Sequence, residues 1–224
     1  MRYSFIFFSF LLTCTAFSQI INVPGASNEV LRTRKYTEFE GSAYLIEDWR
    51  PGTIFDKQGQ AYRNIVLRYD IYKKNIEISS ANGILLVSAE LYPRFIIQEI
   101  DKTGILRDRN FVANINPEKP GLYLEELVAG TYSLFRQIEI QLVEETVSGY
   151  GTNTSKKVFQ EKINYFIKSP GGFRGLKLTK ASFIEAFDAE RTIVEEYMQK
   201  EKLKMKSVGD LQNVLDHLNS LKKQ

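Results

Sequence analysis

Apolar and polar residues alternate along much of the chain, and the alternation is clearest in residues 65–72. Successive side chains of a β-strand point to opposite faces, so this run predicts a strand with one face on a core. The core-facing positions would be Ile65, Leu67, Tyr69 and Ile71, and the other face would carry Val66, Arg68, Asp70 and Tyr72. Turn-forming residues at 50–52 and 57–60 precede it, and we interpret residues 49–78 as a β-meander.

Further short apolar runs follow, separated by Gly- and Pro-containing turn signals. The expected strands are residues 84–87, 94–99, 111–115, 122–128, 132–143 and 159–167, with an extended lead at 39–45. Residues 132–143 alternate so that one face is polar, which is typical of antiparallel sheets. Two segments fit less well. Residues 27–29 favour the cap of a short helix that would run to residue 34 or 35, and the polar stretch 144–157 favours an exposed loop.

After residue 172 the apolar period changes from two to that of helices. Thr179 or Ser182 is expected to cap a first helix, and Ser182 with Glu185 matches a capping box. A second helix is expected to start at Asp188. The third is expected to be capped by Ser207 with Asp210, and its apolar stripe is Leu211, Val214, Leu215, Leu218 and Leu221.

Strands followed by helices predict an α+β protein, mainly an antiparallel β-meander folded as a sandwich or partly open barrel. The predicted divisions are a β domain over residues 19–172 and a C-terminal subdomain, residues 173–224, of two to three short helices packed on the sheet.

Residues 1–18 resemble a cleavable export signal, with a basic start, an apolar stretch, and Ala16 and Ser18 at the −3 and −1 positions. We expect the mature chain to begin at Gln19 and to be periplasmic, on the cell surface or secreted. A membrane anchor would need about 20 apolar residues, and this stretch is shorter, so no transmembrane span is expected. A lipoprotein signal would use Cys14, but Thr13 fits that pattern poorly.

Composition excludes several kinds of chemistry. The chain is 43% hydrophobic and 25% charged, as in ordinary globular proteins, and its formal net charge is +3. That charge is too small to indicate a nucleic-acid partner. Cleavage before Gln19 would remove the only cysteine, so the mature chain would have no disulfide, no cysteine nucleophile and no thiolate ligand for a metal.

Acid–base residues give no convincing catalytic set. His217 is the only histidine, and at the flank of the last apolar stripe it is more simply a solvent-facing side chain. A glycosidase needs two carboxyls about 5–9 Å apart, and adjacent acids on a strand point to opposite faces. The candidate pairs are Glu125–Glu126, Glu144–Glu145, Glu195–Glu196 and Glu38 with Glu40. We therefore predict no catalytic residue, no metal site and no cofactor.

Aromatic residues and an arginine are the remaining binding candidates. Trp49, the only tryptophan, lies at the first turn, and Arg68 and Tyr72 share the face of their strand that is turned away from the core. Exposed aromatic and arginine side chains favour binding surfaces. The structural alternative is that Trp49 covers the core and Arg68 pairs with Asp70 or with an acid on the next strand.

Three stretches carry a resemblance: FEGSAYLIEDWRPG with YRNIVLRYDIYKKNIEI, then YLEELVAGTYSLFRQ and VFQEKINYFIK, then the helical tail from residue 177. Together they resemble uncharacterised secreted proteins of the Bacteroidota, over most of the expected mature chain. The resemblance implies location and architecture, and it brings no activity, ligand or catalytic residue.

These observations favour a non-enzymatic binding or scaffolding protein of the cell envelope, with a protein, glycan or lipid partner. One alternative is a carrier that holds an apolar, lipid-like ligand in a β cavity lined by residues such as Leu67, Tyr69 and Ile71. A carboxylate-based hydrolase is the less favoured alternative.

Overall fold

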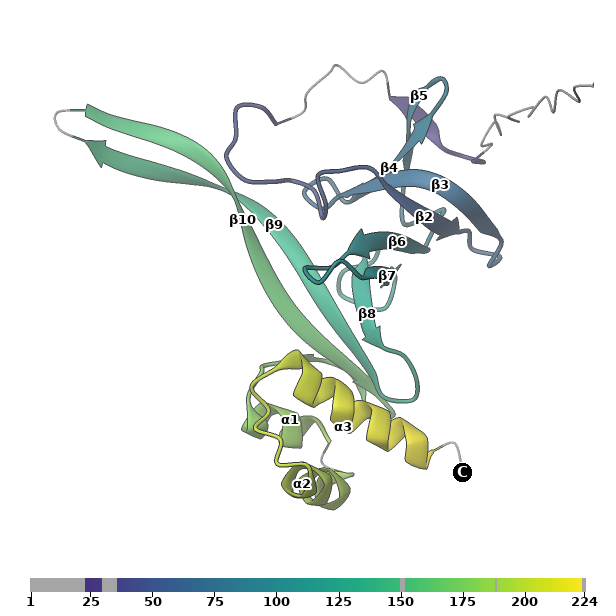
Figure 1. Ribbon diagram of the computed structural model, residues 1–224, viewed down its shortest axis with the longest axis vertical. Helices are drawn as coiled ribbons and strands as arrows, with labels where there is room; N and C mark the ends of the chain where they lie inside the picture. The colour runs from purple at the N-terminus through teal and green to yellow at the C-terminus, as the bar shows by residue number, and fades with distance from the viewer. Residues whose placement is uncertain (1–22, 30–35, 150–151, 188, 223–224) are drawn as a thin grey trace, which may run out of the picture.

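The structure is a computed structural model that describes residues 23–29, 36–149, 152–187 and 189–222. It is an α+β protein in which one antiparallel sheet is followed by three helices (Figure 1). The strands lie in the order β1-β5-β4-β3-β2-β6-β7-β8-β9-β10-β11, so the sheet is open with β1 and β11 at its edges. Most neighbours are consecutive in the chain, as in a meander, and the exceptions are β1 with β5 and β2 with β6. The predicted fold class is confirmed.

The strands are β1 (Ser27–Glu29), β2 (Arg50–Phe55), β3 (Ala61–Asp70), β4 (Asn75–Ser80), β5 (Gly83–Val87), β6 (Arg94–Ile100), β7 (Leu106–Val112), β8 (Leu124–Val128), β9 (Ser133–Gly149), β10 (Thr152–Ser169) and β11 (Gly172–Leu176). The helices are α1 (Lys180–Ala186), α2 (Arg191–Lys200) and α3 (Val208–Leu221). No described helix is long and apolar enough to cross a membrane.

The first half of the sheet curves around one hydrophobic core. The alternate residues predicted to face inward, Ile65, Leu67, Tyr69 and Ile71, are all buried. At the centre of this core the ring of Tyr69 contacts Phe95, Phe111 and Tyr123, and Phe95 stacks on Phe111 at 4.7 Å. The period-two pattern therefore specified this face correctly.

A second core lies between the helices and the last strands. Thr179 caps α1 by accepting the N–H of Ser182, and Ser207 caps α3 by accepting the N–H of Asp210. The stripe predicted on α3 is buried except at Leu221, which is exposed. Because β11 is hydrogen-bonded to β10, the sheet extends past residue 172 into the segment that the sequence assigned to the helical subdomain.

The prediction of a loop over residues 144–157 is wrong. β9 and β10 pair continuously over almost their whole length and project from the body as a two-stranded arm, residues 141–149 and 152–160 (Figure 1). Opposite charges face one another across it, with Lys157 paired to Glu144 and Lys156 paired to Glu145. Such cross-strand pairs stabilise a two-stranded ribbon. The sequence did not predict these strands because apolar residues do not alternate along them.

Two smaller predictions are also wrong. Residues 27–29 pair with β5 as strand β1 and do not cap a helix. The local sequence pattern does not show that the edge of β5 is available for pairing. Residues 50–52 lie inside β2 and not in a turn, and a Cβ on Gly52 would be 2.4 Å from the carbonyl oxygen of Ile96. The glycine there permits close strand packing. The predicted export signal with Cys14, the predicted cleavage site between Ser18 and Gln19, and Asp188 lie outside the described residues.

Candidate binding site

The side chain of Arg68 is enclosed by two aromatic rings and a carboxylate. Its guanidinium lies 3.9 Å from the centre of the Tyr44 ring and 4.6 Å from that of Trp49. Its Nη2 donates to Glu77 on the neighbouring strand β4 at 2.6 Å, and the Glu77 side chain is fully buried. With 17% of its side chain exposed, Arg68 is a cation held between two aromatic rings and a buried carboxylate. This geometry favours a structural role.

Tyr72 lies in a different environment. Its ring contacts Tyr36 at 6.1 Å and Phe159 of β10 at 5.2 Å, while 39% of the residue is exposed. The Tyr36 hydroxyl donates to Asp70 at 2.8 Å, and burial together with that carboxylate raises the pKa of Tyr36 well above its ordinary value. The structure thus brings Trp49 and Arg68 together, and it places Tyr72 at the base of the β9–β10 arm.

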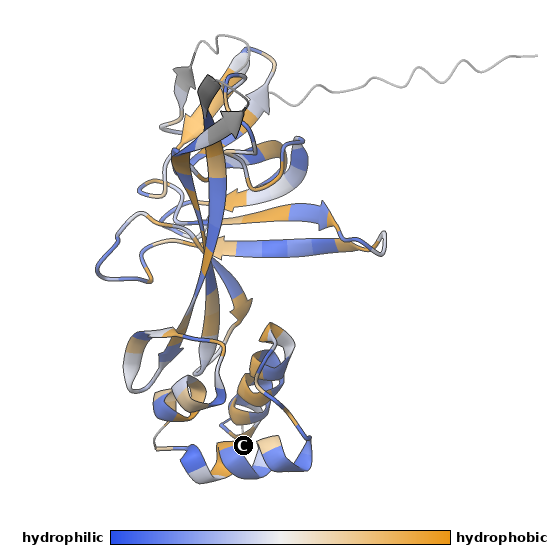
Figure 2. Ribbon diagram, turned by 90° about the vertical axis from the view of Figure 1, so that its left-hand side faces the viewer, coloured by the Kyte–Doolittle hydropathy of each residue, from blue (hydrophilic) through white to orange (hydrophobic). Residues whose placement is uncertain are grey.

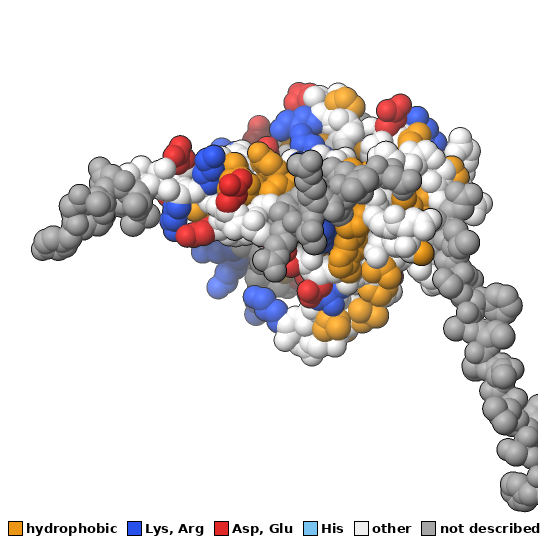
Figure 3. Space-filling model, turned by 90° about the horizontal axis from the view of Figure 1, so that it is seen from above, with side chains coloured by type: hydrophobic (Ala, Val, Ile, Leu, Met, Phe, Trp, Pro, Cys, Tyr) orange, Lys and Arg blue, Asp and Glu red, His pale blue; other side chains and the backbone are white. Residues whose placement is uncertain are grey.

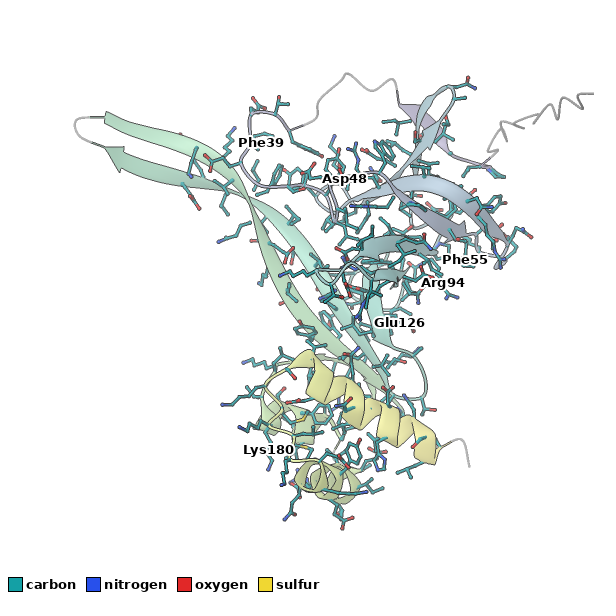
Figure 4. All side chains as sticks on the ribbon, in the orientation of Figure 1. Phe39, Asp48, Phe55, Arg94, Glu126 and Lys180 are labelled. Atoms are coloured by element: carbon teal, nitrogen blue, oxygen red, sulfur yellow. The ribbon has the colours of Figure 1, made fainter. Side chains whose placement is uncertain are left out.

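The segment before β2 fastens that base. The backbone N–H of Glu40 donates to the carbonyl of Lys157 at 3.0 Å, and the N–H of Phe159 donates to the carbonyl of Glu40 at 2.8 Å. Lys156 adds an ion pair to the Glu40 carboxylate at 2.7 Å. Phe39, labelled in Figure 4 where this segment crosses the arm, packs on Phe159 at 5.3 Å. Residues 157–159 of β10 therefore have a partner on their outer edge.

Further along the same edge of β10, residues 165–169 pair with β11. Residues 160–164 lie between these two partners, and within the described chain no strand pairs with them on that side. Main-chain groups of a strand alternate sides, and Lys157 and Phe159 point outward, so Glu161 and Ile163 also present their N–H and C=O groups outward. We call residues 160–164 the open edge of β10.

A pocket of about 900 Å³ adjoins the open edge. Its walls come from β10, β11, the following turn and α1, and they include Ile163, Tyr165, Leu176, Leu178 and Ala181. Ile163 is 41% exposed although it lies on the same face of the strand as the buried Ile167. The alternation of apolar residues in 159–167 was visible in the sequence, but the free edge was not, because it depends on where β11 ends.

Other hollows lie elsewhere on the described part of the chain. One, of about 500 Å³, lies beside Tyr72 and combines apolar walls such as Ile71, Ile138 and Ile140 with Lys74 and Lys119. The carrier hypothesis placed its cavity at Leu67, Tyr69 and Ile71. Of these, Ile71 lines this hollow, whereas Leu67 and Tyr69 are packed within the core.

The second hollow, of about 330 Å³, is lined by charged groups between the β6–β7 ribbon, β8 and α3. Arg109 donates to both carboxylate oxygens of Glu125, and Arg136 pairs with the same carboxylate at 2.6 Å. Burial would raise the pKa of Glu125, but the two guanidinium groups outweigh it and hold the pKa below its ordinary value. Glu126, labelled in Figure 4, instead accepts from Asn110. These charges satisfy one another.

His217 has a packing contact. Its ring stacks on Tyr197 with the ring centres 4.0 Å apart, which joins α3 to α2. Among the described residues no three His, Cys, Asp or Glu side chains are grouped so that they could hold a metal ion.

Comparisons with protein-family models, with curated proteins and with solved structures find no match to this chain.

Proposed function

We propose that this protein is an exported binding or scaffolding protein of the cell envelope, and that it binds an extended polypeptide segment along the open edge of β10. The observation that carries the proposal is the pair of outward main-chain groups at Glu161 and Ile163, between two occupied stretches of the same edge. An extended peptide can add a strand to such an edge and gain main-chain hydrogen bonds.

The pocket beside the edge supports this assignment because it offers side-chain selectivity. A strand placed on residues 160–164 would direct alternate side chains to the face that holds Ile163 and Tyr165. Leu176 and Leu178 also line this pocket. We therefore expect the bound segment to be about five residues long and to carry at least one apolar residue that packs there.

Location is part of the same proposal. The export signal in residues 1–18 supports an envelope or extracellular site, which favours a protein, glycan or lipid partner over a nucleic acid. Mass spectrometry of the mature protein should show a chain that starts at Gln19. A mature chain that starts at an acylated Cys14 would instead make the protein lipid-anchored.

A second candidate function has one observation in its favour. The hollow beside Tyr72 has a volume in the range of small-molecule sites, and its two lysines suit the head group of a long-chain acid. Calorimetric titration with a fatty acid tests it. Saturable binding that is lost on Lys74→Glu with Lys119→Glu, while peptide binding persists, would favour the carrier.

Proline substitution separates edge binding from other uses of this surface. Glu161→Pro removes an outward N–H and leaves the pairing with β9 intact, because prolines are tolerated where the N–H faces away from the ladder. Glu161→Ala is the matched control, since it removes the same exposed side chain and keeps the N–H. Both variants should unfold at similar denaturant concentrations.

The probe is a phage-displayed library of linear peptides, with selected binders resynthesised and titrated by calorimetry. We expect Glu161→Ala to bind the peptide like the parent and Glu161→Pro to bind it at least about tenfold more weakly. A loss of that size is expected when one hydrogen bond is removed and the strand register is disturbed. Equal binding by the two variants, or a library that yields no binder, would refute the edge as the site.

A further inference from the structure

The β6–β7 hairpin has an apolar tip in open solvent. Ile100, Ile105 and Leu106 are 55%, 55% and 57% exposed, more than any other large hydrophobic residue that the structure describes. Ile100 and Leu106 face each other across the hairpin, and Ile105 closes the turn beside them. Strand side chains alternate, so Ile100 and Leu106 lie on one face of the ribbon and Ile105 lies on the other. The three exposed side chains make the end of the ribbon apolar on both faces, and we call them the hairpin tip.

This hairpin projects from the body. β6 pairs with β2 only through residues 94–97, and β7 pairs with β8 only at Phe111 and Val112. The rest is a ribbon that extends away from the sheet (Figure 2). In Figure 3 it forms the lobe at the lower edge, where hydrophobic side chains lie open to the viewer. The body therefore leaves the hairpin tip free to meet a surface.

The turn does not need these apolar residues, because the β2–β3 hairpin has the same turn without them. Asp56 and Asp101 each receive two backbone N–H bonds on one carboxylate oxygen, from residues two and four positions later. Gly59 and Gly104 have φ of +82° and +81°. Where the first turn has Gln60 and Ala61, the second has Ile105 and Leu106.

The turn is also suited to an apolar medium. The N–H groups of Asp101, Thr103, Gly104 and Ile105 are all hydrogen-bonded within the turn. Arg107 neutralises Asp101 through an ion pair at 2.5 Å. Backbone groups that enter lipid have to be satisfied internally, and this turn leaves few of its donors without a partner. Lys102 at the turn is placed to meet phosphate groups at the membrane surface.

We propose that the hairpin tip is a membrane contact, in which Ile100, Ile105 and Leu106 insert into the lipid interface and hold the protein against a bilayer. The side chains are aliphatic, whereas protein–protein hot spots are enriched in Trp, Tyr and Arg and poor in Leu. Three half-exposed aliphatic side chains bind more weakly than one myristoyl chain, which is itself marginal. The contact is therefore reversible.

The test is sedimentation of the full chain with vesicles of phosphatidylcholine alone and of phosphatidylcholine with phosphatidylglycerol, at millimolar lipid. The double variant Ile105→Gln, Leu106→Ala gives the tip the residues of the other turn. We expect it to fold like the parent and to partition about tenfold less, or lower still, into both vesicles. The reciprocal variant, Gln60→Ile with Ala61→Leu, should gain partitioning.

A second measurement reports position directly. An environment-sensitive dye on Lys102→Cys, in a chain with Cys14→Ser, should shift to shorter emission wavelengths with vesicles. The same dye on Lys57→Cys, the matching position of the other turn, should not. Three results would each overturn the proposal. The first is a dye at position 102 that shows no shift, and the second is binding to anionic vesicles only that is equally strong in the double variant. The third is a double variant that loses capture of a protein partner but keeps its binding to vesicles.

Discussion

The buried side chain of Asn219 binds both main-chain groups of Tyr132. Its Oδ1 accepts the Tyr132 N–H at 2.9 Å, and its Nδ2 donates to the Tyr132 carbonyl at 2.8 Å. The two residues are 87 positions apart. A side chain of helix α3 therefore satisfies the backbone N–H and C=O of the residue just before β9. This contact explains why a polar residue interrupts the apolar side of α3.

Asn219→Leu should destabilise the protein by about 2–4 kcal/mol, because it leaves a buried N–H and a buried C=O without partners. The measurement is the free energy of unfolding from urea titration followed by circular dichroism. Asn213→Leu, on the exposed side of the same helix, is the control and should change stability little. Equal effects of the two variants would show that the Asn219 contact has no energetic weight.

Leu215→Asp tests whether the helices are part of the folded body. Leu215 is fully buried, so a carboxylate there should cost at least about 4 kcal/mol. Leu221→Asp changes the same residue type at a position that is 44% exposed, and it should cost less than about 0.5 kcal/mol. If Leu215→Asp unfolds at the denaturant concentration of the parent, the helices do not contribute to the fold.

Arg68→Ala should cost about 2–4 kcal/mol, since the buried Glu77 would lose its guanidinium partner and two aromatic rings would lose the cation between them. Arg107→Ala, whose side chain is 65% exposed, breaks an ion pair worth less than about 1 kcal/mol.

Trp49 emission should shift in Arg68→Ala because the cation lies over that ring, and it should stay unchanged in Arg107→Ala. If Arg68→Ala retains full stability but loses a ligand, the arginine acts as a binding residue.

Stability should fall in acid through Glu125. Its folded pKa is held below the ordinary value of 4.5, so its contribution is present above that value and is lost as the pH falls through the folded pKa. Urea unfolding at neutral pH and at about pH 3 should show this loss in the parent and a smaller one in Glu125→Gln. An identical pH dependence in both proteins would exclude this carboxylate as a source of the loss.

Local pattern determined much of the fold. The alternation in residues 65–71 specifies a core face because strand side chains have a period of two, and the caps at Thr179 and Ser207 follow from side chains that bond backbone groups three residues away. The same reasoning predicted an acid on the next strand as one partner for Arg68, and Glu77 occupies that position. These features involve neighbours along the chain or across one hairpin.

The tertiary structure alone decided the arm, the open edge of β10 and the isolation of the hairpin tip. Residues 144–149 and 152–157 have no apolar period, yet they pair as strands, with Lys156 and Lys157 opposite Glu145 and Glu144 across the ribbon. The open edge exists because β11 ends opposite Tyr165 while Glu40 arrives at Val158 from far away in the chain. Which main-chain groups remain unpaired depends on where every other strand of the sheet begins and ends. The periodicity of apolar residues along the sequence contains no information on those positions.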